Sequence, residues 1–503
     1  MKTSNERQAK KINRVRKKIN TGRLINRDIL KVFVFFALLF CALIVFMIHY
    51  LAADAPTVIN NSYNRRSDVL AKTVRRGSIL AEDGTELAYT ESQNEEEDIR
   101  VYPYGNVFAH VVGFDSNGRA GLEAAYNYYL LTSHASIFDK ISNEFKGEKN
   151  PGDNLQTTLN AGLQQYISDL MGDNDGAAVC MDPATGKVLA MVSKPDFDPN
   201  SIAQIWDVLV SDEDEEGDGT YASESKSVLI NRAAQGLYTP GSTFKIFTLY
   251  EYYLEHPEMI SKYTYNCKGS ISVGDTTISC LDGEAHGQEN LVSAFANSCN
   301  CVFGTIGLDL DLARFRQTNE QLLFGTKLPL DIPSVASIYK LTSKDSEYDI
   351  MATAIGQGDT QMTPLHLAMV VGAIANDGMC MKPHLVSKIL NNREETVKVF
   401  QAEEYERLFS SSEADYLKSC LRAVVTDGTG YAVYPGNFQA YGKTGTAEKE
   451  SGSGYEYDHS WFAGWAENDG QKLVVCVILE DMESAGTRAV YLTKNIFDYY
   501  FGY

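Results

Sequence analysis

The hydrophobic pattern of this chain begins with a long apolar run near the N-terminus. Residues 32–50 contain no acidic or basic side chain except His49. At ~1.5 Å per residue, a helix of this length nearly crosses a hydrocarbon core of ~30 Å. The pattern therefore predicts a membrane-spanning helix over residues 32–51. A cleaved signal peptide is the alternative, because Ala53-Asp54-Ala55 resembles a cleavage site, although the apolar run exceeds the usual core of about 7–15 residues.

Beyond this run, residues 52–150 show short, mixed segments. Residues 77–88 predict a strand, a turn at the Glu-Asp-Gly sequence of 82–84, and a returning strand. Because the pattern changes near residue 152, we expect residues 52–150 to form a separate domain that precedes a larger one.

From residue 152 onward the pattern predicts longer elements. The sequence LQTTLNAGLQQYISDLM indicates a strand and then an amphipathic helix, and GAAVCMDPATGKVLAMVS indicates a β-hairpin. Apolar helical stretches follow at residues 291–308, 365–376 and 414–426, and strand-like runs return at 446–467 and 472–480. Because strands come from both ends of this region with helices between them, we expect an α+β domain over residues 151–503.

Charge is distributed unevenly between the two ends of the chain. The formal net charge is −21, yet residues 1–31 carry eleven Lys or Arg against two acidic residues. The acidic remainder would repel phosphates, which argues against general nucleic-acid binding. The positive-inside rule places the basic tail in the cytoplasm and the residues after about 53 outside the cell. The acidic run at 211–219 is interpreted as a solvated loop, because a calcium loop requires spaced ligands and a closing Glu.

The nine cysteines match no strong zinc-binding spacing. Cys267 and Cys280 flank a turn-rich stretch in which a local hairpin would bring them together, and an exported location permits a disulfide. Whether they form one is left open by the sequence. Cys299 and Cys301 are one residue apart, so we expect them to alternate rather than converge and to act as small buried packing groups.

Candidate chemistry begins with Ser242 and Lys245, which share a Ser-x-x-Lys spacing. Ser242 follows the turn Thr239-Pro240-Gly241 and opens an apolar helical stretch. Three residues along a helix place the two side chains on one face, ~5–6 Å apart at Cβ. Burial would lower the pKa of the lysine so that it could take a proton from the serine. The spacing alone is weak, because a helix cap followed by an ordinary lysine is equally compatible with it. It also occurs at Ser223/Lys226 and Ser337/Lys340.

Two further motifs strengthen the choice of Ser242. Ser298-Cys299-Asn300 lies between Ser242 and the single Lys-Thr-Gly of the chain, Lys443-Thr444-Gly445, which continues to Thr446. A strand with this sequence offers a cation, hydroxyls and an open backbone face to an extended substrate.

Together, these three motifs are typical of β-lactamases and penicillin-binding proteins. The chain resembles a class B penicillin-binding protein, a monofunctional peptidoglycan D,D-transpeptidase. Segments that resemble this family include NRAAQGLYTPGSTFK, AIGQGDTQMTPLHLAMVVGAIANDG and YGKTGTAE, while RRGSILAEDGTELA and GLEAAYN resemble its non-catalytic pedestal. The resemblance implies a serine transpeptidase/β-lactamase-like domain, an antiparallel sheet with flanking helices, on an elongated dimerisation-like pedestal.

The resemblance also implies a role for each motif residue. Ser242 would be the nucleophile, Lys245 the general base, Ser298 a proton relay to the leaving D-alanine, and Asn300 a holder of the substrate amide. Lys443 would set the electrostatics and steer the terminal carboxylate. The hydroxyls of Thr444 and Thr446 would bind substrate beside Gly445, and the backbone N–H groups of Ser242 and Thr446 would form an oxyanion hole.

Partners and alternatives follow from the same resemblance. Expected partners are peptidoglycan stem peptides, a lipid-linked precursor, β-lactam inhibitors and a polytopic membrane glycosyltransferase, and no metal or cofactor is required. A membrane-bound β-lactamase or β-lactam sensor would share all three motifs, but needs neither the anchor nor the pedestal. A catalytically silent scaffold for the glycosyltransferase is a further alternative, which the intact Ser242, Lys245 and Lys443 oppose.

Overall fold

The computed structural model describes residues 2–50, 70–92, 98–209, 228–274, 276–434, 436–450, 456–482 and 488–503. The chain divides into two compact units, residues 1–65 and 66–503. In the first unit, helix α1 (Lys2–His49) is continuous, and its part Ile29–His49 is long and apolar enough to cross a membrane. The expected apolar helix is therefore confirmed, and the basic tail that precedes it belongs to the same helix. The predicted acidic loop at 211–219 lies outside the described residues.

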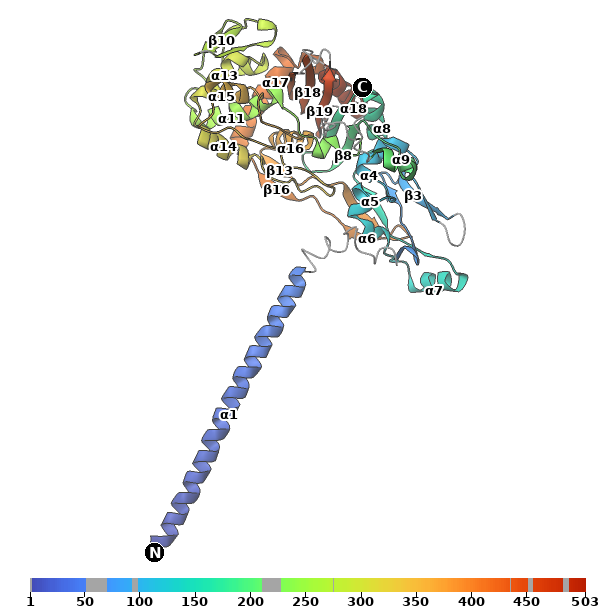
Figure 1. The fold of residues 1–503 in the computed structure, drawn as a ribbon, viewed down its shortest axis with the longest axis vertical. Helices are drawn as coiled ribbons and strands as arrows, with labels where there is room; N and C mark the ends of the chain where they lie inside the picture. Colours follow the sequence, from blue (N-terminus) through green and yellow to red (C-terminus); the bar gives the residue numbers. More distant parts are fainter. Residues whose placement is uncertain are drawn as a thin grey trace. The chain divides into compact units, whose positions relative to one another are not determined.

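A five-stranded antiparallel sheet forms the centre of the second unit (Figure 1). Its strands, in spatial order, are β17 (Gln439–Glu450), β18 (Glu456–Asn468), β19 (Gln471–Met482), β7 (Gly176–Met181) and β8 (Val188–Lys194). The sheet therefore joins the C-terminal strands to the predicted hairpin, which is confirmed as β7 and β8. Because β17 lies at the edge, one side of the Lys443–Thr446 strand is left for other contacts.

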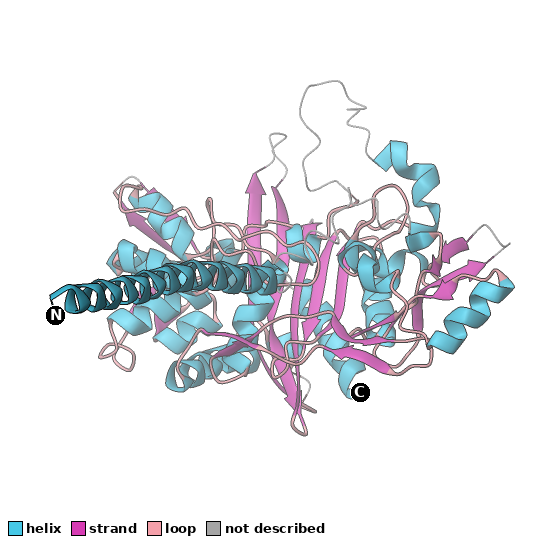
Figure 2. Ribbon diagram, turned by 90° about the horizontal axis from the view of Figure 1, so that it is seen from below, coloured by secondary structure: helices cyan, strands magenta, loops and turns pink. Residues whose placement is uncertain are grey.

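Helices cover both faces of this sheet, as the cyan helices on either side of the long magenta strands in Figure 2 show. On β19, Val474 and Cys476 belong to the core that contains α16 (Pro364–Ala375). Val475 and Val477 alternate with them and pack with α8 (Ala161–Met171) and α18 (Arg488–Phe501). Because both faces are buried, the strand is apolar at consecutive positions instead of alternating.

A second sheet of six strands lies in the N-terminal part of the unit. Its order is β15 (Thr396–Val399), β14 (Val386–Leu390), β6 (Asn154–Thr157), β2 (Ile79–Leu80), β3 (Glu86–Ser92) and β4 (Asp98–Val101). Strands β2 and β3 confirm the strand, turn and strand expected for residues 77–88. Strands β14 and β15 come from the C-terminal half of the chain, and residues 66–503 form one compact unit. The division into 52–150 and 151–503 stays a prediction.

Buried charges join the two segments that resemble a pedestal. Glu123 is fully buried and accepts hydrogen bonds from Nε of Arg76 at 2.5 Å and from Nε of Arg100 at 2.7 Å. The side chain of Arg76 also donates to the Glu123 carbonyl and to Asn127. Because two guanidinium groups surround it, the pKa of Glu123 is lowered despite its burial. The RRGS and GLEAAYN sequences thus form one packed structure.

The other α-helices and strands of the described residues complete the second unit. The helices are α4 (Ala109–Val112), α5 (Gly121–Ala125), α6 (Asn127–Leu130), α7 (Ile137–Lys146), α9 (Ile202–Leu209), α10 (Arg232–Gln235), α11 (Lys245–Glu255), α12 (Leu291–Ala296), α13 (Asn300–Asp309), α14 (Leu312–Gln321), α15 (Glu347–Ala354) and α17 (Ser411–Asp427). The strands are β1 (Val74–Arg75), β5 (Asn150–Pro151), β9 (Tyr265–Cys267), β10 (Ser270–Val273), β11 (Thr276–Ser279), β12 (Gly287–Glu289), β13 (Met379–Met381) and β16 (Glu404–Arg407).

One expected helical stretch differs from the structure. Residues 291–308 form two helices, α12 and α13, instead of one continuous stretch. Ser298 separates them with a φ of +56°, a left-handed conformation that ends α12 and redirects the chain. An apolar pattern does not report the backbone conformation of a single residue, so it could not reveal the left-handed Ser298.

Candidate active site

The turn that carries Ser242 is held against the edge of the central sheet. Gly241 has a φ of +53°, and a Cβ at this position would lie 2.3 Å from the carbonyl oxygen of Thr446. Its N–H donates to the carbonyl of Gly356 at 2.9 Å. Only glycine combines this conformation with so close an approach. The following 3₁₀ turn, Gly241–Phe244, therefore presents Ser242 beside β17 and continues directly into α11.

Lys245 is the first residue of α11 and is fully buried. Its Nζ donates to Ser242 Oγ at 3.0 Å, to Ser298 Oγ at 3.1 Å and to Asn300 Oδ1 at 2.6 Å. Burial disfavours the ammonium form and lowers the pKa of Lys245 to about 7. The amine is therefore neutral in a large fraction of molecules near neutral pH, as a base for the Ser242 hydroxyl must be.

Ser298 and Asn300 reach the site from the break between α12 and α13. A left-handed serine is uncommon, and strain of this kind is concentrated at functional sites. Asn300 begins α13, and its Nδ2 donates to the carbonyl of Ser279 at 2.8 Å. The Ser-x-Asn motif is thus held both by Lys245 and by the segment that precedes it.

Lys443 lies on β17 and is fully buried beneath the cleft. Its Nζ donates to Ser298 Oγ at 3.0 Å and to the carbonyl of Thr444 at 3.1 Å. Burial and the positive charge of Lys245 lower the pKa of Lys443 well below its ordinary value. Because the Lys443 amine is enclosed, it acts on the site through its direct hydrogen bond to the Ser298 hydroxyl.

A cleft of about 290 Å³ opens above these groups. Six of the predicted residues line it, namely Ser242, Ser298, Asn300, Thr444, Gly445 and Thr446. The other two, Lys245 and Lys443, lie buried beneath it with their Nζ atoms bonded to Ser298. The structure therefore brings all eight predicted site residues together.

The competing Ser-x-x-Lys pairs do not share this environment. Ser337 Oγ accepts a hydrogen bond from the backbone N–H of Thr363, and Lys340 lies at the surface beside Asp359. The pair Ser223/Lys226 lies outside the described residues.

Sequence reasoning missed several residues of the cleft. The Oγ1 atoms of Thr429 and Thr444 are 2.6 Å apart, so Thr429 orients a hydroxyl of the Lys-Thr-Gly strand. The sequence marked Thr429 only by a Gly-Thr-Gly run directly after α17, which is a weak indication of a site residue. Gln357 and His286 also line the cleft.

Trp461 is buried as sheet packing would require, but its Nε1 also donates to the carbonyl of Thr239 at 3.0 Å and so helps to hold the Ser242 turn.

The cysteines next to the site are arranged differently from the prediction. Cys299 and Cys301 are buried, as expected, but they do converge on a common neighbour. Cys280 Sγ lies 3.8 Å from Cys299 Sγ and 3.6 Å from Cys301 Sγ. The prediction that Cys299 and Cys301 alternate rested on their own segment alone. Cys280 follows β11, a separate element, and lies close to both of them. In the structure Cys267 and Cys280 are free thiols whose Sγ atoms are 3.7 Å apart.

A serine hydroxyl bonded to a buried lysine of lowered pKa is characteristic of serine acyltransferases that form a covalent intermediate. Residues 176–498 match the penicillin binding protein transpeptidase domain. Residues 76–155 match the penicillin binding protein A dimerisation domain. The chain therefore belongs to the penicillin-binding protein transpeptidase family.

Individual relatives extend over most of the chain. It is 31% identical over 434 residues to the peptidoglycan D,D-transpeptidase PbpA of Mycolicibacterium smegmatis, covering 81% of this chain and 84% of that protein. It is 28% identical over 461 residues to the peptidoglycan D,D-transpeptidase MrdA of Acinetobacter baumannii, covering 80% and 66%.

Solved structures resemble the fold over a similar extent. The D,D-transpeptidase domain of a peptidoglycan glycosyltransferase from Eggerthella lenta has a TM-score of 0.74 at 30% identity, covering 86% of this chain and 99% of that one. The ceftriaxone acyl-enzyme complex of penicillin-binding protein A from Mycobacterium tuberculosis has a TM-score of 0.74 at 27% identity, covering 85% and 99%.

Proposed function

We propose that this chain is a peptidoglycan D,D-transpeptidase that cross-links stem peptides through an acyl-enzyme on Ser242. The observation that carries the proposal is the bonding of Lys245 Nζ, which contacts both the Ser242 and the Ser298 hydroxyls. The first hydroxyl is the nucleophile, and the second lies where a leaving amine needs a proton. Relatives named as peptidoglycan D,D-transpeptidases support the same reaction.

In the acylation half, Ser242 Oγ attacks the carbonyl carbon of the penultimate D-alanine and its proton passes to neutral Lys245. The C–N bond to the terminal D-alanine then breaks, and the leaving amine takes a proton delivered through Ser298 Oγ. Lys443, 3.0 Å from the same oxygen, holds this hydroxyl in position. D-alanine leaves, and the acyl group remains on Ser242.

The cleft supplies the groups that stabilise this reaction. The backbone N–H groups of Ser242 and Thr446 receive the oxyanion, a contribution of about 3–4 kcal/mol per donor in comparable enzymes. The amide of Asn300 holds the substrate amide, and the hydroxyls of Thr444 and Thr446 bind the substrate carboxylate. In the second half, an amine of another stem peptide attacks the ester and its proton passes to Lys245. The C–Oγ bond then breaks, and Lys245 returns the proton to Ser242 Oγ.

The location and partners form part of this proposal. Helix α1 serves as a single membrane anchor, with the basic tail in the cytoplasm and the catalytic domain outside the cell. A lipid-linked precursor supplies the stem peptide, a polytopic membrane glycosyltransferase acts beside this chain, and β-lactams acylate Ser242. Acyl-enzyme complexes of a similar protein with ceftriaxone, imipenem and penicillin G support the last point.

The exposed face of α7 supports a protein partner for the N-terminal part. Ile137, Phe138 and Phe145 are 73%, 84% and 89% exposed, and Ile141 lies on the same stripe of the helix. A contiguous apolar surface of this kind marks an interaction site. We assign it to the membrane glycosyltransferase.

The test is to label the full-length protein in detergent with a fluorescent penicillin. We expect label on the wild type, none on Ser242→Ala, and full label on Ser337→Ala, which changes the serine of a competing Ser-x-x-Lys pair. Undiminished labelling of Ser242→Ala would refute the nucleophile. The released D-alanine and the peptide product are then measured with a stem peptide and an acceptor amine. Transfer to the amine supports a transpeptidase, whereas rapid loss of label to water indicates a β-lactamase.

A further inference from the structure

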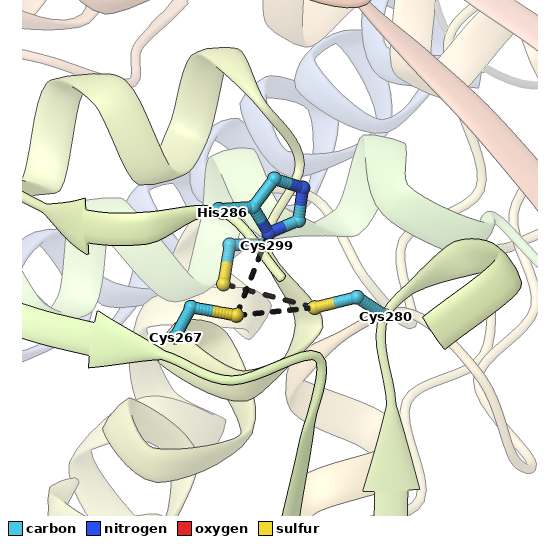
Figure 3. Close-up of side chains that lie close together, drawn as sticks. All are labelled: Cys267, Cys280, His286 and Cys299. Atoms are coloured by element: carbon cyan, nitrogen blue, oxygen red, sulfur yellow. Dashed lines mark hydrogen bonds between the residues drawn. The ribbon is translucent and has the colours of Figure 1, made fainter. Parts of the chain in front are cut away.

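Three cysteines and a histidine converge beside the Ser-x-Asn motif, as Figure 3 shows. Cys267 ends β9, Cys280 follows β11, His286 precedes β12, and Cys299 is the residue before α13. Their potential ligand atoms all lie within 4.8 Å of one another. The three thiols are 2%, 4% and 0% exposed, so the group is closed to solvent on most sides.

Three of the six separations between these atoms match the edges of a zinc tetrahedron closely, and the other three lie within 4.8 Å. Cys267 Sγ and Cys280 Sγ are 3.7 Å apart, and Cys280 Sγ and Cys299 Sγ are 3.8 Å apart. Zn–S bonds of about 2.3 Å at tetrahedral angles give S···S edges of about 3.8 Å. Cys267 Sγ lies 3.5 Å from His286 Nδ1. The corresponding S···N edge, with a Zn–N bond of about 2.1 Å, is about 3.6 Å.

We propose that Cys267, Cys280, His286 and Cys299 bind one structural Zn²⁺ ion through three thiolates and Nδ1 of the imidazole. Four protein ligands with no open position are typical of structural rather than catalytic zinc. Thiolate and imidazole donors select zinc over magnesium or calcium, which prefer oxygen.

The backbone around Cys267 supports a thiolate at this position. The N–H of Gly269 donates to Cys267 Sγ at 3.4 Å, the kind of second contact that stabilises a metal-bound sulfur. Gly269 has a φ of +91°, and a Cβ there would lie 2.2 Å from the carbonyl oxygen of Gly283. This turn is therefore shaped so that the backbone can fold tightly around the sulfur.

A disulfide between Cys267 and Cys280 is the alternative occupant of these thiols. A disulfide would involve only two of the four converging side chains, and it would not explain why His286 and Cys299 lie beside them. It also requires an oxidant to remove two electrons, whereas zinc binding requires only the loss of thiol protons. Cys301 Sγ, 3.6 Å from Cys280 Sγ, is the nearest thiol outside the proposed ligand set.

The metal would attach residues 265–289 to the catalytic motif. Cys299 lies between Ser298 and Asn300, and the amide of Asn300 donates to the carbonyl of Ser279, the neighbour of Cys280. His286 lines the catalytic cleft itself. Zinc would therefore fix the left-handed Ser298 and orient Asn300 without touching the substrate, so the four ligands act as positioning residues.

The first experiment measures zinc in the purified full-length protein by elemental mass spectrometry, after expression with zinc and purification in detergent without chelators. We expect close to one ion per chain. Cys280→Ser and His286→Ala should lose most of it, whereas Cys301→Ala and the distant Cys420→Ser should keep it. Loss of zinc in Cys301→Ala with retention in Cys299→Ala would overturn this ligand set.

The second experiment does not depend on the variants folding. The wild-type protein is stripped with a chelator and reloaded with Co²⁺, and we expect the absorption of tetrahedral cobalt with thiolate charge transfer. Stripping should also slow acylation by fluorescent penicillin, and Zn²⁺ should restore it. A wild-type chain that contains no stoichiometric metal and has a Cys267–Cys280 disulfide by peptide mass spectrometry would overturn the proposal. The metal content of the protein does not depend on whether Ser242 is the nucleophile. Failure of the zinc proposal can therefore be distinguished from failure of the proposed function.

Discussion

Lys245 Nζ lies 3.0 Å from Ser242 Oγ, in a position that excludes water from the lysine. Enclosure of the amine distinguishes this pair from Ser337 and Lys340, since Lys340 is exposed beside Asp359. A lysine in water would be protonated at neutral pH and could not accept the serine proton.

The pH dependence of acylation follows from this enclosure. The pKa of Lys245 is lowered to about 7, so below that value the amine is charged and cannot act as a base. We expect the second-order rate of labelling by fluorescent penicillin to rise with pH, to reach half its maximum near the pKa, and then to level off. Lys245→Arg should lose about 10²–10⁴-fold in rate, because a guanidinium group stays charged. A rate independent of pH in this range would contradict the role of Lys245 as base.

The close approach of Gly356 to the Ser242 turn gives a second prediction. Gly356 has a φ of +86°, and an added Cβ would lie 1.8 Å from the carbonyl oxygen of Gly241. Gly356→Ala should therefore displace the turn and abolish labelling by penicillin. Gly358 has a φ of +78° but no backbone atom near an added Cβ, so it is the matched control. Gly358→Ala should cost roughly 1–2 kcal/mol of strain and retain labelling, and equal loss in both variants would refute the explanation.

Local patterns predicted the parts of the site that lie on single elements. Ser242 and Lys245 are three residues apart, and Lys443 to Thr446 share one strand, so spacing related the members of each motif. The order of all three motifs was needed to choose Ser242 over the competing serines. The bend at Ser298 was not predictable, because an apolar pattern carries no information on the φ of a single residue.

Non-local packing explains what the sequence left out. The four proposed zinc ligands come from separate elements between residues 267 and 299, so no short spacing joins them. Strand β14 pairs with β6, which is more than two hundred residues earlier in the chain. Neither strand carries a local feature that specifies its partner, and the contribution of residues 386–399 to the N-terminal sheet could therefore not be predicted.

A buried ion pair between α10 and β19 of the central sheet gives a third prediction. Arg232 Nε donates to Glu480 Oε1 at 2.8 Å, and the Tyr238 hydroxyl donates to the same oxygen at 2.6 Å. Arg232→Met would leave the carboxylate buried without its cation, and we expect the free energy of unfolding to fall by about 3–5 kcal/mol. Denaturant unfolding measures this change. Adding Glu480→Gln should recover part of the loss.

Arg393 provides the control for this measurement. Its guanidinium pairs with Asp139 at 2.7 Å, but the Arg393 side chain is 55% exposed. Arg393→Met should change the free energy of unfolding by less than about 1 kcal/mol. Equal decreases in the free energy of unfolding for Arg232→Met and Arg393→Met would show that burial does not determine the contribution of the Arg232 ion pair to stability.

The apolar stripe of α7 gives the last prediction. The helix has a Ser136 N-cap and ends at Gly147, so its two ends are locally stabilised while no residue of it is buried. Phe138 and Phe145, 84% and 89% exposed, contribute little to folding in isolation. Phe138→Ser combined with Phe145→Ser should therefore leave the unfolding midpoint and penicillin labelling unchanged but sharply reduce co-purification with the proposed partner, a membrane glycosyltransferase. Tyr431→Ser, at a site 61% exposed elsewhere, is the matched control. Undiminished co-purification of the double variant would remove α7 from the interface, because its two largest apolar side chains would then contribute nothing to binding.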